Sequence, residues 1–264
     1  MKDKRQTLFV ILAAIFLTNA ILAEIIGVKI FSLESSLGLE PANIPLFGNW
    51  VLDFNLTGGV VIWPVVFITT DIINEYFGKK GVRKISYIAV GCISYSFLAI
   101  YIITLLMPAQ FWLDVNATGP NGGPFNVNYA FKVIFRQGMG IIIGSLVAFL
   151  IGQLLDVFVF QKLRKITGSK MIWLRATGST LISQFVDSFV VLGIAFYILA
   201  PEGKAWPLAQ LMSVGTINYI YKFVIAIVLT PLIYLAHNWI DKYLGKELSE
   251  ELQEEAAAGS QGFF

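Results

Sequence analysis

The chain has 264 residues, of which 56% are hydrophobic and 14% are charged, and its mean hydropathy is +0.73. Soluble domains carry about 25% charged residues, so this composition excludes an ordinary water-soluble protein. A net charge of +2 gives no indication of nucleic-acid binding, and one cysteine with one histidine forms no cluster for zinc, haem or iron–sulfur chemistry. We therefore expect no cofactor and no nucleic-acid partner, and we place the function within a lipid bilayer.

Six apolar stretches follow one another along the chain, and each is long enough to cross a bilayer, which takes about 20 apolar residues. They cover residues 7–31, 58–77, 85–107, 131–160, 173–199 and 208–239. The first contains Asn19 and Glu24 and does not end in a small-residue cleavage pattern, so we interpret it as a span and not as a signal peptide. The sequence thus predicts an all-α polytopic membrane protein, a bundle of six transmembrane helices.

The lysines and arginines favour one orientation of this bundle. Fourteen of the 19 lie before the first stretch, between the second and third, around the connection of the fourth and fifth, or after the sixth. Short positively charged loops stay in the cytoplasm, so we expect both termini there and the protein in the inner (plasma) membrane. No soluble linker divides residues 1–246, which we predict to be a single domain; residues 247–264 are predicted to be an acidic, low-complexity tail in solvent.

Polar residues near the middle of the spans indicate a binding site. A charge near the bilayer centre costs about 2.5 to 3.5 kcal/mol, so such side chains are expected to face protein or a wet cavity. Helical spacing puts Gln184 and Asp187 on one stripe and Asn218 and Lys222, four residues apart, on another. We predict that these stripes face each other; alternatively, an Asp187–Lys222 ion pair only lowers the cost of burying two charges.

A second polar group lies near the predicted cytoplasmic ends of the helices and comprises Asp71, Asn74, Glu75, Asp156 and Arg175. One hypothesis is a gate, in which Asp71 or Asp156 pairs with Arg175 or Arg83 when the inner side is closed. The alternative is a static salt-bridge cluster that fixes the helix ends.

Two further features concern shape. Pro64 predicts a kink, beside which Trp63 and Phe67 form either a stacking wall for a flat ligand or a simple interfacial packing site.

Small residues recur every four positions in the fourth stretch, a pattern that lets two helix backbones approach closely. They are Gly140, Gly144, Ala148 and Gly152, and their partner is either a helix of the same chain or a second copy in a homo-oligomer.

Four segments together resemble a known family. Residues 67–78, Phe-Ile-Thr-Thr-Asp-Ile-Ile-Asn-Glu-Tyr-Phe-Gly, followed by a basic cluster, resemble the second-helix signature of the queuosine precursor transporter family, also called the vitamin uptake transporter family. Residues 151–160, 175–188 and 218–222 resemble its fourth, fifth and sixth helix motifs. The resemblance implies a six-helix importer of 7-deazaguanine-type bases, the precursors preQ0 and preQ1 of queuosine in tRNA.

The candidate residues suit a flat, guanine-like cargo, which presents adjacent N–H donors to a carboxylate. On this interpretation Asp187 or Glu24 accepts from those donors and Lys222 is the counter-charge. Amides and one aromatic ring complete the contacts: Asn19, Gln184, Asn218, and Trp63 or Tyr219.

Three functional classes remain open at this point. The first is a secondary transporter working by alternating access, driven by protons through Asp71, Asp156 or Glu24. The second is the substrate-binding subunit of an ATP-driven vitamin importer, which must rely on other subunits because the chain has no Walker sequence. An intramembrane enzyme is disfavoured, because His237 stands alone at the predicted inner end of the last stretch, where we expect an interfacial or helix-capping role.

Overall fold

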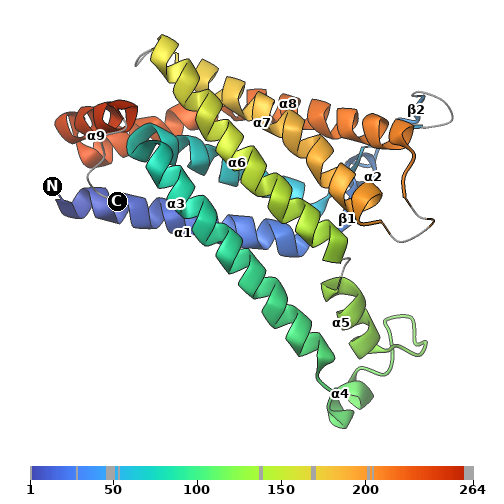
Figure 1. The fold of residues 1–264 in the computed structure, drawn as a ribbon. Coiled ribbons are helices and arrows are strands. Elements are labelled where there is room, and N and C mark those ends of the chain that lie inside the picture. The colour runs from blue at the N-terminus through green and yellow to red at the C-terminus, as the bar shows by residue number, and fades with distance from the viewer. Residues whose placement is uncertain are drawn as a thin grey trace.

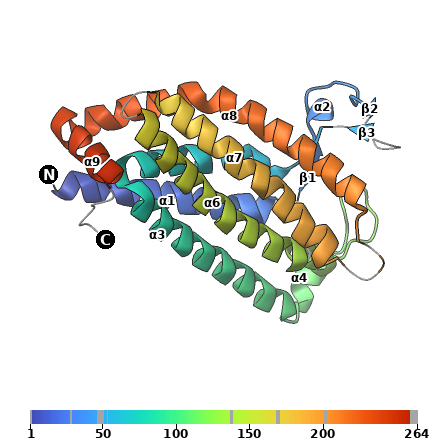
Figure 2. The ribbon, with the colours of Figure 1, turned by 45° about the horizontal axis from the view of Figure 1, so that its top comes forward.

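The computed structural model describes residues 2–27, 29–45, 51–52, 54–136, 139–167, 171–200, 203 and 205–258. Within these residues, five helices are long and apolar enough to span a membrane: Lys4–Ile26, Trp63–Leu105, Ile143–Thr167, Thr177–Ile198 and Leu208–Leu244. They belong to α1 (Lys2–Ile26), α3 (Trp63–Leu105), α6 (Met139–Thr167), α7 (Ile172–Gly193) and α8 (Leu208–Leu244), which pack as one bundle (Figures 1 and 2). The expectation of an all-α membrane protein is confirmed.

The predicted second and third spans are joined in α3, which is broken at one glycine. Gly78 has φ 61° and ψ −168°, a conformation that is essentially restricted to glycine. The break divides α3 into residues 63–77 and 79–105. At 1.5 Å per residue the first part is about 22 Å long, shorter than the ~30 Å hydrocarbon core of a bilayer. A 3₁₀ turn, η1 (Gly58–Val61), precedes it, and six crossings remain a prediction.

The connection between α1 and α3 is folded into two short ribbons. Strand β1 (Ile30–Ser32) pairs antiparallel with β4 (Asn55–Thr57), and β2 (Ile44–Pro45) pairs with β3 (Val51–Leu52). Helix α2 (Leu33–Ser36) follows β1 and carries Glu34, whose carboxylate accepts a 2.7 Å hydrogen bond from the Phe54 N–H. That bond lowers the pKa of Glu34 and favours the ionised form that ties the two sides of the connection together. The first predicted span therefore ends at Ile26, because residues 30–32 enter a strand.

The predicted fourth span is also divided. Its first residues, 131–135, belong to helix α5 (Val127–Phe135), and α6 begins only at Met139. Helix α5 and the preceding helix α4 (Gln110–Val115) lie at the end of the molecule away from the chain termini (Figure 1). Arg136 follows α5, and its Nε donates to Thr104 Oγ1 at 2.7 Å. This bond fixes the end of α5 to the end of α3. The fifth span agrees better with its prediction, since α7 continues through a π-helical turn, η2 (Ile194–Ile198).

The expectation of a solvent-exposed C-terminal segment is wrong for residues 247–258, which belong to α9 (Lys246–Ala258). Leu248, Leu252 and Ala256 recur every four residues and are buried, so the acidic stretch is one face of an amphipathic helix. Leu248 and Leu252 join a core cluster with residues of α1 and α3, including Leu12 and Phe77. Helix α9 and the N-terminus lie at the same end of the bundle (Figure 1).

Candidate substrate site

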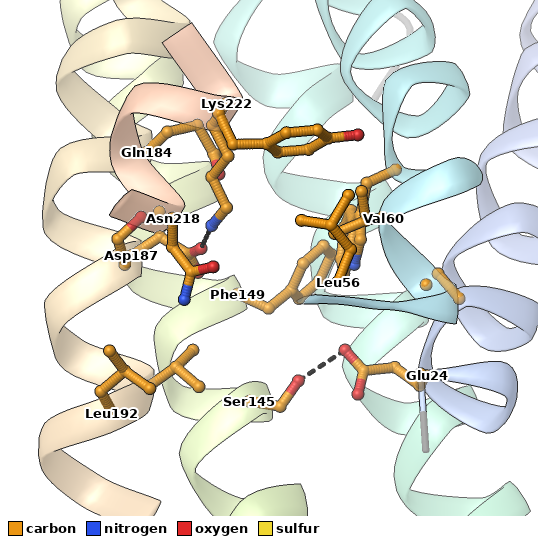
Figure 3. Close-up of a pocket in the computed structure, with 18 of the residues that line it drawn as sticks. Glu24, Leu56, Val60, Ser145, Phe149, Gln184, Asp187, Leu192, Asn218 and Lys222 are labelled. Atoms are coloured by element: carbon orange, nitrogen blue, oxygen red, sulfur yellow. Dashed lines mark hydrogen bonds and ion pairs between the residues drawn. The ribbon is translucent and has the colours of Figure 1, made fainter. Parts of the chain in front are cut away.

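A cavity of about 470 Å³ lies between the long helices, within the size range of small-molecule sites. Seven of the nine predicted substrate-binding residues line it: Glu24, Trp63, Phe67, Gln184, Asp187, Asn218 and Lys222. They come from α1, α3, α7 and α8, so the cavity unites residues almost 200 positions apart in the sequence. Figure 3 shows how several of them face one another.

One wall of the cavity is polar and is formed by α7 and α8. Lys222 Nζ and Asp187 Oδ2 form the expected ion pair, and their side chains are 21% and 17% exposed, so both charges stay open to the cavity. Asn218 lies one turn before Lys222, next to the pair (Figure 3). The amide oxygen Oε1 of Gln184 is buried and has no hydrogen-bond partner among the residues that the structure describes. A buried acceptor without a partner is costly, so this wall is suited to a ligand that donates hydrogen bonds.

The opposite side carries a carboxylate and aromatic rings. Glu24 on α1 accepts a 2.6 Å hydrogen bond from Ser145 Oγ on α6 (Figure 3). Trp63 stacks on Phe67 with ring centroids 5.8 Å apart and an interplanar angle of 21°, and its ring also lies 5.7 Å from that of Phe149. Trp63 and Phe67 both line the cavity, and their role as a stacking wall for a ligand stays a prediction.

Two predicted binding residues lie elsewhere. Asn19 donates a 2.8 Å hydrogen bond to the Ile15 carbonyl of its own helix. Tyr219 packs edge-on against Phe185 at 5.2 Å. Consecutive helical residues point in directions about 100° apart, so Asn218 faces the cavity while Tyr219 turns toward the outer side of α7.

The predicted inner cluster is assembled around Glu75. Arg175 Nη2 lies 2.9 Å and Arg164 Nη2 lies 3.5 Å from Glu75 Oε1, and all three side chains are almost completely buried. We expected Arg175 to pair with Asp71 or Asp156; the structure pairs it with Glu75. Arg164, which we did not predict, also donates to the Glu75 carbonyl at 3.0 Å and to the Gln253 carbonyl of α9 at 2.6 Å.

The remaining predicted gating residues lie between this cluster and the cavity or beside it. Asn74 Oδ1 accepts from Gln161 at 2.8 Å. Asp156 lines the cavity and accepts from Ser183 at 3.4 Å. Asp71 is buried close enough to Asp156 for their carboxylates to interact, and its Oδ1 has no hydrogen-bond partner within the described part of the chain.

The small-residue face of α6 packs within the chain where its surroundings are described. Gly144, Ala148 and Gly152 are buried, and a Cβ atom on Gly152 would lie 3.6 Å from that of Asp187. Close approach of α6 to α7 therefore brings Asp187 to the cavity wall. The surroundings of Gly140 lie outside the described part.

Several residues of interest were missed by sequence reasoning. Ser145 was detectable as a polar residue in an apolar stretch, but Leu56 and Phe149 were not, because many Leu and Phe residues have the same sequence surroundings.

His237 is buried, with Nδ1 3.0 Å from the Tyr76 hydroxyl, so the expectation of an interfacial or capping role is wrong. Its ring stacks on Tyr76, which also donates to Asp241 at 2.7 Å.

Comparisons with known proteins agree with this geometry. The family model described as "Putative vitamin uptake transporter" matches residues 57–236. A "Probable queuosine precursor transporter" of Bacillus subtilis (strain 168) is 29% identical over 190 residues, which cover 71% of this chain and 75% of the relative. A protein of the same name from Haemophilus influenzae (strain ATCC 51907 / DSM 11121 / KW20 / Rd) is 31% identical over 176 residues, 67% of this chain and 66% of the relative.

A third relative, the "Queuosine precursor transporter" of Escherichia coli (strain K12), is 29% identical over 178 residues, 67% of this chain and 71% of its own. No solved structure matches the chain. The apolar helices, the cavity between them and the names of the matching family and relatives together indicate a multi-pass membrane transporter and not an enzyme. The family model matches more than half of the length of this chain, so the chain belongs to the vitamin uptake transporter family.

Proposed function

We propose that this protein imports queuosine precursors, 7-deazaguanine-type bases such as preQ0 and preQ1, across the inner (plasma) membrane. The names of the three relatives support the substrate class. The observation that carries the proposal is the Asp187–Lys222 pair, which is open to the same cavity that the aromatic rings of α3 line.

The cavity chemistry fits a flat base with both donors and acceptors. Gln184 Oε1 and the Asp187 carboxylate accept from the N–H groups of the guanine-like edge. Lys222 and the Asn218 amide donate to its carbonyl and ring nitrogens. Trp63 offers its face to the ring, and stacking of this kind adds about 0.5 to 1.5 kcal/mol beyond area burial.

Transport by alternating access requires that the cavity open to each side in turn. The buried cluster of Glu75, Arg164 and Arg175 lies at the end of the bundle that α9 covers, and we assign it to the closed inner gate. Asp71 and Asp156 lie next to that gate, and we assign proton coupling to this carboxylate pair. Asn74 holds α6 to α3 through Gln161 and has to release it when the gate opens.

Uptake of labelled preQ0 and preQ1 into proteoliposomes that hold only this protein tests the proposal. Accumulation that requires an imposed proton gradient is the expected result, whereas equilibration without a gradient would replace proton coupling by facilitated diffusion. Binding without any transport would contradict the transport mechanism itself.

The central site is tested in the same assay by Asp187→Asn and Lys222→Met. Each substitution leaves one charge of the pair unbalanced in the cavity, and such losses cost about 2 to 5 kcal/mol, so we expect uptake to fall at least tenfold. Asp114→Asn and Lys79→Met are matched controls, because both residues are exposed and lie outside the cavity. Wild-type uptake in both site variants would refute the assignment.

A further inference from the structure

We propose that Glu24 binds an ammonium group on the substrate, so that the site prefers a flat base carrying a primary amine to the same base with an uncharged substituent. This inference rests on the proposed function, because it identifies which member of the substrate class the cavity takes.

The charges around the cavity are unbalanced. Its described lining contains three carboxylates, those of Glu24, Asp156 and Asp187, and one cation, Lys222. Lys222 is paired with Asp187. Glu24 therefore has no cation beside it on the cavity wall, and an ionised carboxylate away from water requires a positive or hydrogen-bonding partner.

The hydrogen bonding of Glu24 leaves one oxygen atom for a ligand. Oε1 takes the proton of the Ser145 hydroxyl at 2.6 Å, and Oε2 has no partner among the described residues. The Ser145 bond fixes the orientation of the carboxylate without neutralising it. A donor that also carries positive charge satisfies both the free oxygen atom and the charge.

Position determines which part of the ligand reaches Glu24. Glu24 lies on α1, across the cavity from the Asp187–Lys222 pair of α7 and α8 (Figure 3). A flat base that presents its guanine-like edge to that pair and its face to Trp63 directs the opposite substituent toward α1. The polar edge of the base and its substituent therefore contact different walls of the cavity.

The two candidate bases differ at that substituent. PreQ1 carries an aminomethyl group, which is an ammonium at neutral pH, whereas preQ0 carries a nitrile, which is uncharged and donates no hydrogen bond. An ammonium beside Glu24 forms an ion pair in a site with little water, where attraction is stronger than in bulk solvent. A nitrile leaves the carboxylate unpaired.

Equilibrium binding of both bases to the purified, detergent-solubilised protein tests the inference. We expect the wild type to bind preQ1 at least tenfold more tightly than preQ0. Glu24→Gln should weaken preQ1 binding at least tenfold and change preQ0 binding by less than twofold. Glu24→Asp keeps the negative charge and should retain the preference for preQ1. If Glu24→Gln fails to fold, the ratio of preQ1 to preQ0 affinity is measured in Glu24→Asp instead. Glu40→Gln is the matched control, because that carboxylate is exposed and outside the cavity.

The outcomes separate this inference from the function on which it rests. Equal losses for the two bases in Glu24→Gln, or tighter wild-type binding of preQ0, would overturn the role of Glu24 and leave the transporter assignment intact. A wild-type protein that binds neither base would overturn the proposed substrate class and this inference with it.

Discussion

Glu75 is the centre of the buried charge cluster at one end of the bundle, and its carboxylate is only 2% exposed. Removing two charges from water is costly, and their attraction balances this cost only when both partners are present. Loss of one partner is therefore more harmful than loss of the pair.

Replacement of Arg175 by methionine should lower the free energy of unfolding by about 3 kcal/mol, because Glu75 stays buried and its remaining cation among the described residues, Arg164, lies 3.5 Å away. Thermal unfolding of the purified protein in detergent measures the effect. The double variant Glu75→Gln with Arg175→Met should recover part of the loss. Arg83→Met, at an exposed position, should leave the unfolding temperature unchanged. A fully stable Arg175→Met protein would contradict the structural importance of the pair.

Sequence reasoning found the polar residues of both clusters but not all of their partners. The four-residue spacing of Asn218 and Lys222, and the stripe through Asp187, defined helix faces that meet in the structure. Arg175 was placed in the correct cluster and paired with the wrong carboxylate. The choice among Asp71, Asp156 and Glu75 depends on how α3 and α6 are rotated relative to α7, which intramembrane polarity alone does not determine.

Gly78 is the position at which α3 changes from one helix to another, and two observations make it irreplaceable. Its φ of 61° is unfavourable for other residues, and a Cβ atom there would lie 2.9 Å from the Ala256 carbonyl oxygen of α9. Gly78→Ala should therefore lower the free energy of unfolding by about 1 to 3 kcal/mol, which is the cost of such a strained backbone conformation. Gly91→Ala is the matched control within the same element, since a Cβ there meets nothing within 4 Å and alanine favours a helix. The unfolding temperatures of the two variants should move in opposite directions; equal values would contradict the importance of the break.

Helix α9 depends on Leu252, which is completely buried. Leu252→Ala leaves a cavity without reducing helix propensity, and substitutions of this kind cost about 2 to 5 kcal/mol. Helix α9 should then detach more readily, which limited proteolysis measures as faster cleavage near Gly245. Glu251→Ala changes the exposed neighbour and should be cleaved like the wild type. Equal cleavage of both variants would show that Leu252 does not hold the helix.

The elements show where the sequence was informative and where it was not. Long apolar stretches identified the membrane helices, because that signal depends on composition. The strands of residues 30–57 are at most three residues long, too short for a periodic pattern. Helix α9 has such a pattern in Leu248, Leu252 and Ala256, but its acidic composition favoured the interpretation as a tail.

At the scale of the whole molecule, the number of membrane crossings is connected to the position of the two chain ends. Arg5 Nη2 lies 2.6 Å from Glu255 Oε2, so the start of α1 and the end of α9 occupy the same end of the bundle. A chain whose ends lie on one side of a membrane crosses it an even number of times. Five helices qualify by length and composition, an odd number, so we expect a sixth crossing from the division of α3 at Gly78.

This parity argument predicts that residues 79–84 lie on the same side as both termini, in the cytoplasm, and that residues 116–126 lie outside. Single-cysteine variants in a Cys92→Ser background test it through labelling of intact cells with a membrane-impermeant maleimide. Asn121→Cys should react in intact cells, whereas Lys80→Cys and the reference variant Lys4→Cys should react only after the membrane is permeabilised. Labelling of one of Lys80→Cys and Lys4→Cys from outside, with the other protected, would mean that an odd number of crossings separates residues 4 and 80, and thus that residues 63–77 do not cross. The short first part of α3 would then enter and leave the bilayer on one side, and the Arg5–Glu255 contact would have to break in the membrane.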